Sequence, residues 1–115
     1  MFGNAQSSHF ERIEMPDSDV EYYSCIPFDD CVLLKLTDDT KQTGRKNTVF
    51  TFQKYDTVFQ YKSLADVTLQ TKRSAFLEYT TKDAHYSLSY QISGTYTISV
   101  VSVKDLSVQY LHGKL

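Results

Sequence analysis

The chain has 115 residues, a formal net charge of −2, a hydrophobic fraction of 41% and no tryptophan. A chain of this length forms one domain and buries about 65% of the surface that it exposes when unfolded. Its apolar runs are much shorter than the ~18 residues of a membrane span, and its first residues lack the basic head and apolar core of a signal peptide. We therefore expect an intracellular protein of the cytoplasm or nucleus, not secreted and without a membrane partner.

Charge is distributed unevenly along the chain. Residues 1–39 contain nine acidic and two basic residues, whereas residues 40–115 contain five acidic and ten basic residues. Residues 1–19 show little hydrophobic periodicity, so we expect a flexible acidic arm that precedes a single β domain at residues 20–115. The acidic segment either lies against the basic part of the same chain or meets a basic partner.

Short segments of alternating or compact apolar residues recur along the chain, separated by polar turn residues. The expected strands are residues 21–24, 31–37, 48–55, 57–63, 75–80, 84–92, 96–100 and 106–110. Val, Phe, Tyr and Thr, which favour strands, are abundant in these segments. The sequence therefore predicts an all-β fold, a single small antiparallel barrel or sandwich of about seven or eight strands.

Residues 63–71 fit two local structures. Ser63 and Asp66 match a helix-capping box, which favours one short helix near residues 63–71. Ala65, Val67 and Leu69 instead alternate with polar residues as a strand does. The sequence leaves both interpretations open.

The strongest pattern is the strict alternation of residues 84–100, in which apolar side chains occupy the even-numbered positions. This parity is kept across the hairpin only if the loop has an odd length, as in a turn with Gly94 in the left-handed region. Leu88 then faces Ile98 on the neighbouring strand. A half-buried hairpin turns its apolar face inward, so we expect Leu88 and Ile98 in the core.

Cysteine and histidine are too sparse for a metal site. Cys25 and Cys31 are separated by five residues, whereas zinc ribbons and fingers need two such pairs or a cysteine pair with two closely spaced histidines. His9, His85 and His112 are far apart in the sequence. We therefore expect no metal and no disulfide, with Cys31 packed in the core.

Motifs that carry catalysis are also missing from the sequence. It contains no nucleophile elbow, no phosphate-cradling loop and no His-Glu zinc motif, and its four glycines are too few for a phosphate loop. The adjacent carboxylates Asp29–Asp30 and Asp38–Asp39 are typical of turns, where aspartate bonds locally to the backbone. We expect no catalytic residue, no cofactor and no enzymatic activity.

Basic and aromatic residues are interleaved in the middle of the chain. Single-stranded nucleic acid is bound by this mixture, with cations along the backbone and rings under the bases. The competing interpretation places Phe50 and Phe52, which share one strand face, in the core. The candidate nucleic-acid-binding residues are Lys41, Arg45, Lys46, Lys54, Tyr55, Tyr61, Lys62, Lys72 and Arg73.

Two functions remain as hypotheses. The leading one is a non-enzymatic interaction module, a small subunit of a larger cellular or viral assembly that acts through protein–protein contacts or self-association. Nine tyrosines favour it, because tyrosine offers a large contact area with a polar tip and is enriched at interfaces. The alternative is a small OB-like barrel that binds single-stranded nucleic acid through a basic loop and an aromatic hairpin.

Overall fold

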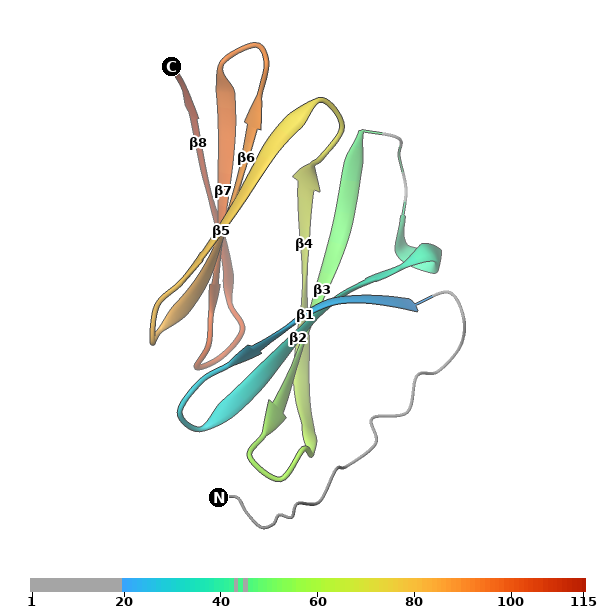
Figure 1. Cartoon of the computed structure of the whole chain (residues 1–115), viewed down its shortest axis with the longest axis vertical. Coiled ribbons are helices and arrows are strands. Elements are labelled where there is room, and N and C mark those ends of the chain that lie inside the picture. Colours follow the sequence, from blue (N-terminus) through green and yellow to red (C-terminus); the bar gives the residue numbers. More distant parts are fainter. Residues whose placement is uncertain (1–19, 43, 45) are drawn as a thin grey trace.

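The computed structural model describes residues 20–42, 44 and 46–115, and within them the fold is all-β (Figure 1). Eight strands in these residues form two four-stranded antiparallel sheets. Each strand pairs with its neighbour in the sequence, so each sheet is a meander. The expected all-β fold with about seven or eight strands is confirmed, while the expected acidic arm at residues 1–19 lies outside the described residues.

The first sheet holds the strands that precede the β4–β5 turn. It consists of β1 (Val20–Pro27), β2 (Cys31–Asp38), β3 (Asn47–Asp56) and β4 (Tyr61–Gln70), in that order. A 3-10 turn, η1 (Asp39–Lys41), follows β2, and the Asp38 carboxylate caps it by accepting from the backbone N–H of Thr40 at 3.0 Å. None of the described residues forms a helix long and apolar enough to cross a membrane.

Residues 63–70 belong to β4, so the helical interpretation of residues 63–71 is wrong. Val67 and Leu69 are buried, and the register pairs Val67 with Phe50 of β3. The capping-box residues Ser63 and Asp66 instead take strand positions opposite β3. The strand indicated by Ala65, Val67 and Leu69 forms because pairing with β3 satisfies the backbone hydrogen-bonding groups. One side of the strand then enters the core.

The second sheet holds the strong alternation seen in the sequence. It consists of β5 (Ser74–Thr80), β6 (Ala84–Gln91), β7 (Thr95–Ser102) and β8 (Val108–Lys114). The register pairs Leu88 with Ile98, as the sequence predicts. Gly94 has a φ of 93°, and its N–H donates to the carbonyl of Gln91 at 2.9 Å, so the predicted odd-length turn is confirmed.

The core lies between the two sheets and is filled mainly from the first. Leu33, Phe52 and Val67 are fully buried there. The buried cluster contains Ile26, Leu33, Phe50, Phe52, Val67, Leu69, Val101 and Leu106. Most of these side chains come from β1, β2, β3 and β4, so the first sheet supplies most of the volume between the layers.

The second sheet turns a largely polar face toward this core. His85, Ser87, Ser89 and Ser99 are all at most 2% exposed. Small serines leave room for the large side chains of the first sheet, because two packed sheets share a fixed space of about 10 Å. The inner face of β6 and β7 therefore carries the odd-numbered, mostly polar residues of the alternating pattern.

Leu88 and Ile98 occupy the opposite, outer face of the second sheet, so the expectation that they belong to the core is wrong. Both are only partly buried and line a hollow on that face. Successive residues of a strand point to opposite sides, so burial of Ser87, Ser89 and Ser99 forces the even-numbered residues outward. The pairing register of β6 and β7 was predicted correctly, but the side of the sheet that faces the core was predicted the wrong way round.

Replacing equivalent leucines on the two faces separates the core from the outer surface. Leu33→Ala should lower the free energy of unfolding by about 2–5 kcal/mol, because Leu33 is 0% exposed. Leu77→Ala should lower it by less than about 1 kcal/mol, because Leu77 is 65% exposed. Urea titration, at protein concentrations where the midpoint does not depend on concentration, measures both values, and equal losses for the two variants would contradict the assigned facing.

Candidate interaction surface

The outer side of the second sheet carries a central row of aliphatic residues. The register places Leu77, Leu88, Ile98 and Leu111 side by side across all four strands. Leu77 is 65% exposed and Leu111 is 56% exposed. Exposure of adjacent branched aliphatic side chains on one sheet face is unusual for a surface that meets only water.

A second row lies nearer the β6–β7 turn and is hollowed. It consists of Ala75, Tyr90, Tyr96 and Gly113. Any side chain at Gly113 would collide with the Tyr96 ring, which covers this glycine. Because Ala75 and Gly113 are small and the Tyr96 ring leans toward β8, the row leaves a recess in the surface.

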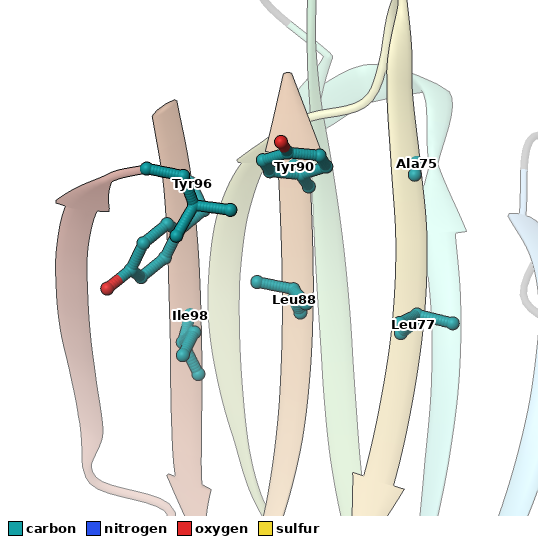
Figure 2. A pocket seen from close by; sticks show the side chains of 7 residues that line it. Ala75, Leu77, Leu88, Tyr90, Tyr96 and Ile98 are labelled. Carbon is teal, nitrogen blue, oxygen red and sulfur yellow. The ribbon is translucent and has the colours of Figure 1, made fainter. Parts of the chain in front are cut away.

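This hollow has a volume of about 430 Å³. Figure 2 shows Tyr90 and Tyr96 at its upper end, Leu88 and Ile98 below them and Leu77 on β5. Leu115, which is 83% exposed, completes the lining. Every lining side chain is aliphatic or aromatic, so the hollow suits an apolar side chain.

A third row closes the other end of the same surface. It consists of Tyr79, Tyr86, Val100 and Gln109. Tyr79 is 68% exposed and its ring centroid lies 6.3 Å from that of Tyr86. The third row therefore places an exposed tyrosine ring, that of Tyr79, at the end opposite the hollow.

These three rows define what we call the apolar face. Strands about 4.8 Å apart and rows ~6.7 Å apart give a face of roughly 19 by 20 Å, or about 400 Å² in projection. None of its twelve positions is charged. Contiguous apolar patches of this size on soluble domains are commonly binding surfaces.

The residues expected to bind nucleic acid fall into separate groups. Lys46, Lys72 and Arg73 are exposed and gather with Gln70 around a hollow of about 330 Å³. The backbone N–H groups of Thr71 and Lys72 both donate to the carbonyl of Lys46, which fixes this arrangement. Arg45 lies outside the described residues.

Two other candidate cations have carboxylate partners. Lys41 Nζ lies 3.1 Å from Asp66 Oδ1, and Lys62 Nζ lies 3.4 Å from Asp56 Oδ2. Asp56 also holds the β3–β4 turn. Backbone N–H groups of this turn, chiefly that of Gln60, donate hydrogen bonds to the Asp56 carboxylate and lower its pKa. These two lysines therefore already neutralise acids of the first sheet.

Lys54 connects the two sheets. Its ammonium donates to the carbonyl oxygens of Val103 at 2.7 Å and Lys104 at 3.0 Å. Both carbonyls belong to the β7–β8 turn. Lys54 is therefore committed to holding this turn against the first sheet.

The two candidate tyrosines lie at the other end of the first sheet from the basic cluster. Tyr55 and Tyr61 pair near the β3–β4 turn, with ring centroids 5.9 Å apart in an edge-on contact. Lys46 precedes the opposite end of β3, where Asn47 pairs with Gln70. The structure thus brings three cations together and keeps the two rings apart from them.

Sequence reasoning missed a buried ionic cluster between the sheets. Lys35 of β2 is 1% exposed, and its Nζ lies 3.1 Å from Glu78 Oε2 of β5. The same ammonium sits 4.4 Å from the ring centre of Phe50 and 4.8 Å from that of Phe76. One signal was present: Lys35 has the same parity as the core residue Leu33 in an otherwise apolar run.

His85 extends this cluster on the second sheet. Its Nε2 lies 2.9 Å from Glu78 Oε1 and its Nδ1 lies 2.9 Å from Thr80 Oγ1. Burial lowers the pKa of His85, while the Glu78 carboxylate raises it and the Lys35 charge lowers it. Burial also lowers the pKa of Lys35, against the opposing effect of Glu78.

The cysteines are free thiols on β1 and β2. Cys25 is exposed and Cys31 is buried, so the expected burial of Cys31 is confirmed. Burial raises the pKa of the Cys31 thiol, which lowers its reactivity. Among the described residues, no three His, Cys, Asp or Glu side chains lie together where they would hold a metal ion.

Comparison with known proteins provides no relative. No family model matches the chain, and neither a curated protein nor a solved structure matches it.

The buried His85 makes stability depend on pH. The unfolded chain binds a proton on this histidine near pH ~6.5, whereas the folded chain resists it, so stability falls as the pH drops below that value. The slope contributed by His85 is at most about 1.4 kcal/mol per pH unit.

Urea titrations at about pH 7.5 and about pH 5.5 measure this loss, because the interval brackets the ordinary histidine pKa. His85→Gln should reduce the difference between the two pH values. His112→Gln, at an exposed position, is the matched control for replacing an imidazole with an amide. An undiminished difference in His85→Gln would contradict the assignment.

Proposed function

We propose that this protein is a non-enzymatic interaction module, a small subunit of a larger cellular or viral assembly, that acts through protein–protein contacts made by the apolar face. The supporting observation is that ten of the twelve positions on this face are apolar and lie outside the core. Burying them against a partner removes apolar surface from water, which is the main driving force of association.

The size of the face is adequate for this role. About 400 Å² of face against an equal partner area gives ~20 kcal/mol of gross hydrophobic stabilisation at ~25 cal/mol per Å². Association costs an estimated ~4–15 kcal/mol in lost freedom of motion. Ordering of the interface side chains subtracts further from the gross gain. The exposed Tyr79 and Leu77 are the side chains that gain most from being covered.

Site-specific photo-cross-linking tests where the contacts form. A benzophenone amino acid placed at Leu77 should cross-link to a bound protein, which mass spectrometry identifies together with its contacted peptide. The matched control carries the same group at Leu64, which is 46% exposed on β4 of the other sheet. Equal cross-linking from both positions would contradict the assignment of the apolar face.

A second candidate function is single-stranded nucleic-acid binding, and the clustering of Lys46, Lys72 and Arg73 is the observation that supports it. Three adjacent cations favour a phosphate backbone. Lys41 and Lys62 take no part in this version of the hypothesis, since each is paired with a carboxylate.

The salt dependence of binding tests this alternative. Affinity for a labelled single strand should fall with salt, and the double variant Lys72→Ala/Arg73→Ala should flatten the logarithmic slope by about 0.7 per lost phosphate contact. Lys62→Ala is the matched control and should leave the slope unchanged. Fluorescence anisotropy measures all three proteins, and absence of binding at low salt would eliminate the hypothesis.

A further inference from the structure

We infer that the occupant of the apolar face is a second copy of this chain, packed face to face about a two-fold axis that crosses the strands in the plane of the interface. This inference rests on the proposed function and names its partner. It is argued from the shape, the size and the charge of the face itself.

The shape of the face is self-complementary. The exposed Tyr79 ring lies at one end, and the hollow lined by Ala75 and Tyr96 lies toward the other. A two-fold axis across the strands exchanges the two ends, so the Tyr79 ring of each copy meets the hollow of the other. Both contacts form at once, as an isologous interface requires.

The register fixes which residues meet in this arrangement. Because the axis crosses the strands, β5 of one copy lies over β5 of the other in the opposite direction. Ala75 then lies over Tyr79 of the second copy, and Leu77, midway between them, lies near its own counterpart. The aliphatic central row therefore forms the middle of the interface.

The area is consistent with a specific dimer. Two faces of about 400 Å² in projection bury together at least about 800 Å², and the relief of the side chains adds to this value. Leu115, 83% exposed beside the hollow, adds apolar surface at the rim. The total approaches the ~1,200–2,000 Å² of specific interfaces.

Charge around the face favours the same axis. The β4–β5 turn at the hollow end carries Lys72 and Arg73. The turns at the other end carry Lys82–Asp83 and Lys104–Asp105, in which each lysine is next to an aspartate and the two charges cancel. An axis along the strands would place the two basic ends together, and like charges repel. An axis across the strands places each basic end near the electrically neutral end of the other copy, so this repulsion is avoided.

Sedimentation equilibrium of the full chain tests the dimer. Wild type should sediment with twice the chain mass and dissociate on dilution. Leu77→Asp should raise the dissociation constant roughly a hundredfold or more, because it places two unpaired carboxylates near the axis. Circular dichroism confirms that this exposed variant folds, and Leu64→Asp on β4 is the control that should stay dimeric.

Cross-linking tests the direction of the axis. In a Cys25→Ser background, an equal mixture of the Ala75→Cys and Tyr79→Cys variants should be joined by a short bis-maleimide. Ala75→Cys alone should not cross-link, because its two copies lie at opposite ends of the interface. Efficient cross-linking of Ala75→Cys with itself would overturn the proposed axis.

Failure of this inference is distinguishable from failure of the proposed function. A wild-type chain that remains monomeric at all concentrations overturns the second copy as occupant. Photo-cross-links from position 77 to a different protein would then still support an interaction module. A monomer that takes up a fluorescent fatty acid in the hollow, with uptake lost in Ala75→Trp, would overturn the dimer in favour of a small apolar ligand.

Discussion

The volume between the two sheets is the constraint on which the rest of this structure depends. Leu33 and Phe52 of the first sheet fill that space and are completely buried. Opposite them the second sheet presents small serines, Ser87, Ser89 and Ser99, with few larger side chains between them. Its leucines and isoleucine, and the tyrosines of β5, β6 and β7, are left on the outside as a consequence. The apolar face is therefore produced by the packing of the interior.

Polar contacts select this facing over its reverse. Shifting the register of the second sheet by one residue would turn Leu88 inward, toward the space that Leu33 and Phe52 already fill. It would also separate Glu78 from Lys35, leaving a buried ammonium without its carboxylate. The bonds from Lys54 to the β7–β8 turn act in the same direction. Specificity of the fold thus rests on ion pairing and hydrogen bonding between the sheets together with the packing of the interior.

Local rules recovered the pairing of the second sheet, because Gly94 and the parity of Leu88 and Ile98 depend only on neighbouring residues. They did not recover its facing, since alternation shows that two faces differ but not which layer lies opposite. Lys35 was missed for the same reason: its partner Glu78 belongs to the other sheet. Residues 61–70 form a strand instead of a helix because β3 lies beside them and pairs with them. The basic cluster needed the fold to bring Lys46 to Lys72.

The ring of Tyr96 occupies the space that a side chain at position 113 would fill. The depth of the neighbouring recess is therefore set by a residue that has no side chain, at the edge of the sheet and away from the core. Any larger residue there forces the ring to move and so reshapes the recess. A single codon at this edge can thus alter the outer surface of the sheet at a position that lies outside the core.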